Sequence, residues 1–248
     1  MLSVSLKKVL KTCSGRITDV VFPPCCLACA TVQPLPDDGL GLCQECRQSA
    51  MPAGESFCPK CAMPLPLADS ACSECRRHDF HFERGMVLGT YRGRMRDWVL
   101  QIKNSDGESL ALVLGKLLGN TLACSGISEN VDAIVPIPMY WLKRMWRGYH
   151  AADVLADGCA RSLQLPIYSD LLRCNRWARK QGTLSRPQRL RNMRGVFSAS
   201  ARYQIPGSRL LLVDDVITTG VTMNEAAKAL LKAGAEEIII AAVAHGTG

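Results

Sequence analysis

Residues 210–220 read LLLVDDVITTG, an aliphatic run followed by two adjacent aspartates and a Thr-Thr-Gly turn. The aliphatic run predicts a buried β-strand. Neighbouring carboxylates repel each other and raise each other's pKa unless cations or hydroxyl groups hold them. Because such a pair is costly for structure alone, we expect Asp214 and Asp215 to bind a ligand. The alternative is an acidic turn that only caps the next helix.

Strand-like and helix-like segments alternate around this stretch. Helical spacing of apolar residues occurs in residues 94–103, 108–123, 148–165 and 222–235. Buried strands are expected at residues 85–93, 131–138, 209–216 and 236–245. This alternation predicts an α/β fold, a parallel sheet flanked by helices. In such sheets ligands bind at the carboxyl ends of the strands, where Asp214 and Asp215 are expected.

The residues after the two aspartates suit a phosphate group. Residues 216–222, VITTGVT, lead from the strand into the next helix and offer backbone N–H groups and three threonine hydroxyls. A glycine-containing loop at a helix N-terminus binds phosphate. Carboxylates a few ångströms away can accept hydrogen bonds from a diol. Phosphate at one end and vicinal hydroxyls at the other describe a 5-phosphorylated ribose.

Eight of the thirteen cysteines form C-x-x-C pairs, namely Cys26/Cys29, Cys43/Cys46, Cys58/Cys61 and Cys72/Cys75. Each pair directs two thiolates at one point, and two pairs complete a tetrahedral zinc site. Sequential pairing predicts two structural Zn²⁺ ions, and pairing of the first pair with the third is the alternative. A single pair could also be a redox dithiol. Cys25 could replace Cys26, and core positions are expected for Cys13, Cys124, Cys159 and Cys174.

Composition divides the chain into three parts. Residues 1–21 have the pattern of a short amphipathic helix. Residues 22–80 contain few large apolar side chains, so we expect a separate double zinc-ribbon module that depends on metal for folding. Residues 81–248 then form the sheet domain. No apolar run is long enough to span a bilayer, and Lys7, Lys8 and Lys11 interrupt the only candidate signal segment, so a cytoplasmic protein is expected.

A basic belt, residues 139–202, stands out in the charge distribution. The chain has a net charge of +8, and this segment contains thirteen Lys or Arg residues against three Asp. One diphosphate does not need so many cations, and Trp141, Trp146 and Trp177 lie among them. Such a belt can bind single-stranded DNA through phosphate contacts and base stacking. A solvated basic surface with the tryptophans in the core is the alternative.

VDDVITTGVT, residues 213–222, resembles the 5-phosphoribosyl-1-pyrophosphate (PRPP) motif of type I phosphoribosyltransferases. The resemblance implies that Asp214 and Asp215 hold the ribose 2- and 3-hydroxyls. It also implies that the 5-phosphate is wrapped by Val216, Ile217, Thr218, Thr219, Gly220, Val221 and Thr222.

The same resemblance places a pyrophosphate loop at residues 135–148, VPIPMYWLKRMWRG, and a mobile loop that closes over PRPP at residues 177–192. Mg²⁺ is expected with PRPP. The polar candidates for pyrophosphate or DNA contacts are Lys103, Lys143, Arg144, Arg147, Arg179, Lys180, Gln181, Arg186, Arg189 and Arg191.

The cysteine pairs, YRG, IK, VPIP, RGYHAADVLA, RKQGTLSRPQRLRNMRGVF and the PRPP motif follow in the order of the ComF family (ComFC- and GntX-like proteins), which the chain resembles over nearly its whole length. Two departures from the usual family pattern concern the substrate side. Tyr149 and His150 replace a Phe-Asn pair, and no aromatic residue follows Lys103.

The resemblance implies a competence, DNA-uptake or DNA-utilisation accessory protein that binds PRPP and single-stranded DNA. It implies a DNA-uptake helicase or another competence protein as partner. Two alternatives remain: an active phosphoribosyltransferase with an unidentified acceptor, and a zinc-knuckle adaptor or regulator. No nucleobase pocket is recognisable in the sequence, and no residue is assigned a catalytic role.

Overall fold

The computed structural model describes residues 23–36, 38–50, 54–68, 70–176, 188 and 192–246. The chain forms two compact units, residues 1–48 and 49–248. The expected N-terminal helix, residues 1–21, and nearly all of the expected mobile loop lie outside the described residues.

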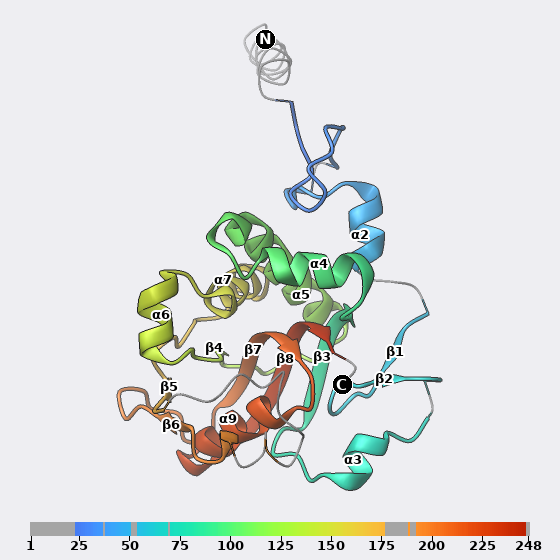
Figure 1. Ribbon diagram of the computed structural model, residues 1–248. Helices are drawn as coiled ribbons and strands as arrows, with labels where there is room; N and C mark the ends of the chain where they lie inside the picture. Colours follow the sequence, from blue (N-terminus) through green and yellow to red (C-terminus); the bar gives the residue numbers. More distant parts are fainter. Residues whose placement is uncertain are drawn as a thin grey trace, which may run out of the picture. The chain divides into compact units, whose positions relative to one another are not determined.

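The second unit contains a four-stranded, fully parallel sheet (Figure 1). Its strands lie in the order β3 (Arg84–Thr90), β8 (Glu237–His245), β7 (Arg209–Ile217) and β4 (Ala133–Pro136). The central strand β8 is buried from Ile238 to His245, and β7 is buried from Leu210 to Val213, as expected for a parallel sheet that is covered on both faces. The predicted α/β sheet is therefore confirmed.

Helices connect the strands. They are α4 (Gly93–Gln101), the short 3₁₀ helix η1 (Ser105–Gly107), α5 (Glu108–Cys124), α6 (Trp141–Arg147), α7 (Ala151–Leu163) and α9 (Val221–Lys232). Leu210 and Leu212 of β7 share a core with Leu230 of α9. Because side chains alternate along a strand, Leu211 and Val213 face the opposite side. On that side α5 and α7 cover the sheet (Figure 1).

The close packing of α5 against α7 depends on glycine. A Cβ atom at Gly115 of α5 would lie 2.3 Å from the carbonyl oxygen of Leu155, and one at Gly158 of α7 would lie 2.2 Å from the carbonyl oxygen of Leu112. The two helix backbones therefore touch, and this contact fixes α7, whose N-terminus lies at the functional site.

Shorter elements complete the second unit: β1 (Ser56–Phe57), β2 (Pro64–Leu65), α3 (Ser73–Arg77), β5 (Leu172–Cys174) and β6 (Phe197–Ala199). The β1–β2 hairpin and α3 carry the second cysteine cluster, which consists of Cys58, Cys61, Cys72 and Cys75. This cluster packs in the same hydrophobic core as the sheet. For this reason the boundary between the two compact units lies between residues 48 and 49. The boundary expected from the composition of the sequence lies near residue 80.

The core expectation for the remaining cysteines holds only in part. Cys159 is fully buried on α7, but Cys124 is exposed at the last position of α5. Cys124 is the last residue of α5 and lies beyond Leu122, the last buried residue of this helix, so its side chain is outside the core. Within the residues that the structure describes, no helix has the length and apolar character needed to cross a bilayer.

Candidate functional site

Asp214 and Asp215, the carboxyl pair, lie in the part of β7 that extends beyond its pairing with β4. Pairing of β7 with β4 ends at Val213, whereas pairing with β8 continues to Ile217. Asp214 and Asp215 thus lie inside the strand, within its predicted bounds of residues 209–216, and pairing with β8 extends β7 four residues beyond its pairing with β4. On the β4 side the strand is open from Asp214 onward, and this gap in the sheet accommodates the site.

Lys103 neutralises part of the charge of this pair. Its Nζ lies 3.2 Å from Oδ2 of Asp215, and the backbone N–H of Asp215 donates to Oδ1 of Asp214 at 2.8 Å. Burial and the neighbouring Asp215 carboxylate raise the pKa of Asp214 well above its usual value, while Lys103 opposes the shift. The site is therefore an anionic pocket with one cation on its wall, suited to a hydroxyl-bearing ligand.

A cavity of about 460 Å³ joins the carboxyl pair to the phosphate loop, residues 216–222. Gly220 is the N-cap of α9 and has φ +69°, a left-handed conformation that favours glycine. At the N-terminus of a helix such as α9 the backbone N–H groups point outward along the helix axis, which favours an anion at this position. The cavity is lined by Tyr91, Lys103, Asp214, Asp215, Val216, Ile217, Thr218, Gly220, Val221, Thr222 and Met223.

A second cavity of about 320 Å³ meets the first at Lys103, Asp214 and Asp215. Its other walls are the segment after β4 and the start of α7, formed by Pro138, Met139, Tyr149, His150, Ala151 and Ala152. It therefore lies at the helix N-terminus that follows the predicted pyrophosphate loop. Together the two cavities offer adjacent places for two anionic groups, with the carboxyl pair between them.

Tyr149 is the unusual side chain of this second cavity. Its hydroxyl oxygen is buried and has no hydrogen-bond partner among the described residues. Burial, Glu108 and Asp215 raise the pKa of the phenol to about 12, so it is a neutral donor at physiological pH. An unsatisfied buried donor costs free energy, which a ligand acceptor would recover.

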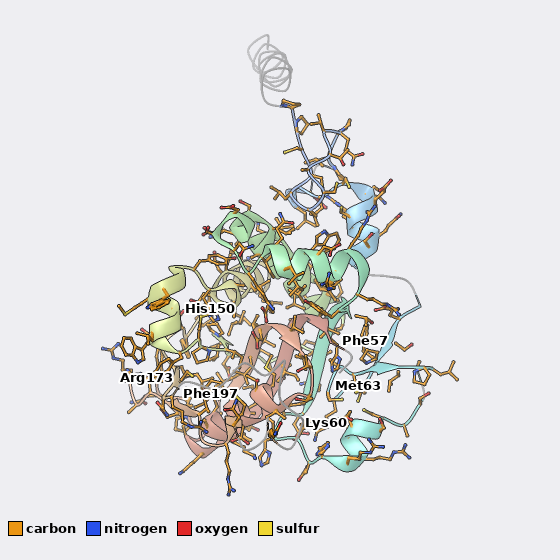
Figure 2. All side chains as sticks on the ribbon, in the orientation of Figure 1. Phe57, Lys60, Met63, His150, Arg173 and Phe197 are labelled. Atoms are coloured by element: carbon orange, nitrogen blue, oxygen red, sulfur yellow. The ribbon has the colours of Figure 1, made fainter. Side chains whose placement is uncertain are left out.

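Near Tyr149, Asp153 of α7 links this helix to the predicted pyrophosphate loop, residues 135–148. Its carboxylate pairs with His150 Nδ1 at 3.2 Å and with Arg144 Nη2 at 2.7 Å. Figure 2 shows His150 beside α6 and α7. Of the other predicted phosphate contacts, Lys143 and Arg147 belong to α6, but their side chains are not described. The remaining candidates on the basic belt, Arg179, Lys180, Gln181, Arg186, Arg189 and Arg191, lie outside the described residues.

Thr219 does not line the ligand cavities. Its side chain turns to the other side of the loop, where its hydroxyl is buried against the second cysteine cluster. Sequence reasoning also gave no indication that Lys103 pairs with Asp215, since the two residues lie on separate elements. Tyr149, by contrast, was recognisable as a departure from the family pattern.

The first cysteine cluster, Cys26, Cys29, Cys43 and Cys46, brings its four Sγ atoms within 4.8 Å of one another. The Sγ atoms of Cys29 and Cys43 are 3.9 Å apart, close to the spacing of about 3.8 Å expected for tetrahedral zinc with Zn–S bonds of about 2.3 Å. A hydrogen bond with Thr31 lowers the pKa of the Cys29 thiol to about 6. These residues fit a structural Zn²⁺ ion, and Cys25 is exposed and outside the cluster.

The second cluster consists of Cys58, Cys61, Cys72 and Cys75. Its Sγ–Sγ distances are 3.7 Å between Cys58 and Cys75 and 3.5 Å between Cys61 and Cys72, which also fit tetrahedral zinc. Burial raises the pKa of the Cys61 thiol, so coordination by a cation would be needed to hold it as the thiolate. The pairing is sequential in both clusters, as predicted, and not cross-braced.

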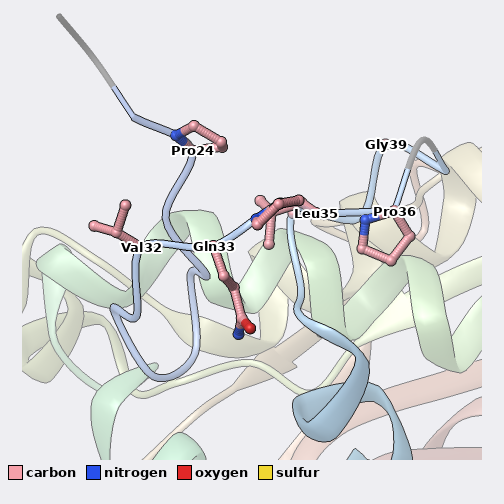
Figure 3. A pocket seen from close by; sticks show the side chains of 8 residues that line it. Pro24, Val32, Gln33, Leu35, Pro36 and Gly39 are labelled. Atoms are coloured by element: carbon pink, nitrogen blue, oxygen red, sulfur yellow. The ribbon is translucent and has the colours of Figure 1, made fainter. Parts of the chain in front are cut away.

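The first unit contains a cavity of about 910 Å³ (Figure 3). Among the residues that the structure describes, its lining has no charged, thiol or imidazole side chain and consists of Pro24, Val32, Gln33, Pro34, Leu35, Pro36, Gly39 and Gly41. The cavity at the carboxyl pair is smaller but carries the convergent polar groups that characterise a binding site.

Comparison with known proteins agrees with this geometry. Residues 17–76 match the family description "Double zinc ribbon domain", and residues 154–247 match "Phosphoribosyl transferase domain". The chain is similar to Competence protein F of Haemophilus influenzae, with 29% identity over 80% of this chain and 87% of the relative. It is 28% identical to the DNA utilization protein YhgH of Escherichia coli O6:H1 over 88% of this chain and 96% of the relative.

A third relative is Competence protein ComFC of Bacillus subtilis, 24% identical over 78% of this chain and 79% of the relative. The alignments with these three relatives cover 80%, 88% and 78% of this chain. With two Cys₄ clusters ahead of a phosphoribosyltransferase sheet, the chain belongs to the ComF family.

Proposed function

We propose that this chain binds PRPP with Mg²⁺ at the carboxyl pair and acts as an accessory protein in DNA uptake or DNA utilisation. The observation that carries the proposal is the shared wall of the two cavities, formed by Lys103, Asp214 and Asp215. PRPP has phosphate and pyrophosphate groups on either side of a ribose diol. The site has a phosphate loop and a helix N-terminus on either side of two carboxylates.

Each part of the chain would meet one part of this ligand. The loop N–H groups and the hydroxyls of Thr218 and Thr222, which line the cavity, donate to the 5-phosphate. Asp214 and Asp215 accept from the 2- and 3-hydroxyls, which relieves the repulsion between the carboxylates. The start of α7, Tyr149 and Lys103 face the pyrophosphate side. When bound, Mg²⁺ supplies positive charge that offsets the charge of the diphosphate.

Isothermal titration with PRPP and Mg²⁺ tests this half of the proposal. PRPP should bind more tightly than ribose 5-phosphate, because the latter fills only the cavity at the phosphate loop. Equal affinities of the two ligands would contradict the assignment of the second cavity.

The DNA half of the proposal rests on the surface of the basic belt. Trp141 and Trp146 are 56% and 87% exposed on α6, with Leu142 and Met145 exposed beside them. They are therefore not core residues, and helical spacing places these four side chains on one face. Exposed tryptophans next to Lys and Arg residues can stack on the bases of a single strand whose phosphates the cations contact. The names of the relatives agree with a role in handling DNA.

A fluorescence-anisotropy salt series with a labelled oligonucleotide tests DNA binding. If phosphates are the main contacts, affinity falls with salt with a log–log slope of about 0.7 per neutralised phosphate. Replacing Arg186, Arg189 and Arg191 by glutamine should flatten that slope and weaken all sequences alike. A matched variant that loses Arg96, Lys116 and Lys232, all outside the belt, should keep it. Absence of binding at low salt would end the DNA half of the proposal.

A further inference from the structure

The second cysteine cluster is built into the sheet unit. Cys58, Cys61 and Cys72 are buried in the same hydrophobic core as Ile217 and Val221, which belong to the phosphate loop. Figure 2 shows Phe57, Lys60 and Met63 of this segment near β1, β2 and β3. The cluster and the phosphate loop are therefore supported by one continuous core.

Backbone contacts fix the cluster to the edge strand of the sheet. The N–H of Gly85 in β3 donates to the carbonyl oxygen of Pro59 at 2.9 Å, between the first two cysteines of the cluster. A Cβ atom at Gly85 would lie 2.8 Å from the carbonyl oxygen of Lys60, so only glycine allows this approach. The metal-binding turn is thus placed directly on β3.

The segment that follows the last cysteine contacts the phosphate loop itself. Phe80 stacks on Phe82 with ring centroids 4.9 Å apart, and its Cε1 lies 3.1 Å from the position that a Cβ at Gly220 would occupy. The backbone N–H of His81 donates to Oδ1 of Asn224 at 2.8 Å. Phe80 therefore packs against Gly220 of the phosphate loop. His81 forms a hydrogen bond to the start of α9 through Asn224.

A small cavity lies between the cluster and the loop. Its volume is about 10 Å³, about the room for one water molecule, and its lining includes Cys61, Glu74, Thr219 and His245. Thr219 Oγ1 and His245 Nδ1 are buried and have no partner among the described residues. A water molecule here would satisfy both atoms and join the loop to the end of β8 next to the cluster.

We propose that metal in the second cysteine cluster holds the phosphate loop in its binding conformation, so that metal binding and phosphoribosyl binding are coupled. The tetrahedral site fixes the turn at residues 58–61 and the helix α3, and these in turn position Phe80 and His81. Without metal, the four thiolates would no longer be drawn together, and the loop would lose its rear support. The ligand half of this coupling rests on the proposed function.

Coupling of this kind is reciprocal: a ligand that favours the ordered loop must raise the affinity of the second cluster for its metal by the same factor. The first cluster belongs to the other compact unit and provides an internal control.

Hydrogen exchange of the amides of residues 216–224 tests the loop support in the full-length chain. The variant Cys72→Ser should release one zinc and accelerate exchange in this segment by about tenfold, a typical size for coupling between sites. Cys43→Ser should also release one zinc but leave the segment unchanged. Phe80→Ala should keep both zinc ions and still accelerate exchange. Unchanged exchange in Cys72→Ser and Phe80→Ala would overturn the proposal.

Should Cys72→Ser not fold, the wild-type chain provides the measurement. A chelator removes zinc stepwise while cysteine alkylation, read by mass spectrometry, identifies the cluster that has opened. Exchange in residues 216–224 should rise with alkylation of Cys58, Cys61, Cys72 and Cys75, and not with alkylation of the first cluster. The proposal would be overturned if exchange in residues 216–224 rose with alkylation of the first cluster, or if exchange did not correlate with alkylation of either cluster.

The ligand arm adds PRPP with Mg²⁺ to the same alkylation experiment. Protection of the second cluster by about tenfold, with none at the first, is expected. If titration shows PRPP binding but both clusters open at unchanged rates, the coupling is refuted. If PRPP does not bind at all, the proposed function fails, while the exchange measurement still decides whether the metal supports the loop.

Discussion

The Nζ atom of Lys103 lies 3.2 Å from Oδ2 of Asp215, at the point where the two ligand cavities meet. Lys103 follows α4, and Asp215 belongs to the central strand β7, so the contact links a peripheral helix to the centre of the site. The ammonium can reach a ligand in either cavity. It also opposes the rise in the pKa of Asp214.

Replacing Lys103 by methionine should weaken PRPP binding by about ten- to a hundredfold, the range expected for losing a hydrogen bond that involves a charged group. Calorimetric titration gives the affinity. Lys232→Met, at the end of α9 and away from both cavities, is the matched control and should bind as wild type does. Loss of affinity in both variants would point to a general charge effect and not to the contact at Asp215.

Asp214→Asn should stabilise the unliganded protein at neutral pH. The folded-state pKa of Asp214 is raised, so the stability contributed by its protonated form is fully present below its ordinary value of 3.8 and is lost as pH rises through the folded-state pKa. The asparagine variant has no such loss. The difference in unfolding free energy should therefore grow as pH rises above 3.8 toward the raised folded-state pKa. Urea titrations at several pH values measure it. A difference that does not depend on pH would show that Asp214 is ionised throughout.

Tyr149→Phe removes one oxygen and leaves the ring. We expect PRPP affinity to fall by about five- to tenfold, because one hydrogen bond to the pyrophosphate side is lost. The affinity for ribose 5-phosphate should stay the same, and thermal stability should not fall, since the hydroxyl has no partner among the described residues of the unliganded protein. Equal losses for both ligands would contradict the assignment of Tyr149 to the second cavity.

Trp141→Ala together with Trp146→Ala separates stacking from phosphate contacts. The double variant should bind single-stranded DNA about tenfold or more weakly, since base–aromatic stacking contributes about 1–3 kcal/mol per base. The salt dependence should not change, because no cation is removed. Anisotropy titrations at two salt concentrations are sufficient. An unaltered affinity would mean that the exposed face of α6 serves another purpose.

The sequence predicted those features that depend on neighbours along the chain. The spacing of the cysteines was sufficient for both clusters, since each C-x-x-C turn is local. The aliphatic run followed by VITTG was sufficient for β7, the turn after it and α9. Contacts between distant segments were not predictable: His81 and Asn224, which join the second cluster to the loop, are 143 residues apart.

The same reason explains the differences in detail. The end of β7 at Ile217 is set by its pairing with β8. The residues of β7 alone do not reveal where this pairing ends. The cysteine pairs reveal a metal site but not the surface on which it packs, so the second cluster was expected in a separate module. Glycine at position 85 is required by the backbone at Lys60, a contact with no local signal.

The most direct test of the account is isothermal titration of PRPP with Mg²⁺ into the wild-type chain and into the variant Asp214→Asn with Asp215→Asn. The substitutions keep the size of both side chains and remove the charges that we propose to hold the ribose diol. We predict measurable binding to wild type and a loss of several kcal/mol in the variant, about 1.5–3 kcal/mol for each charge-assisted hydrogen bond. Equal binding by the two proteins would contradict the assignment of the carboxyl pair. Absence of binding to the wild-type chain would contradict the account as a whole.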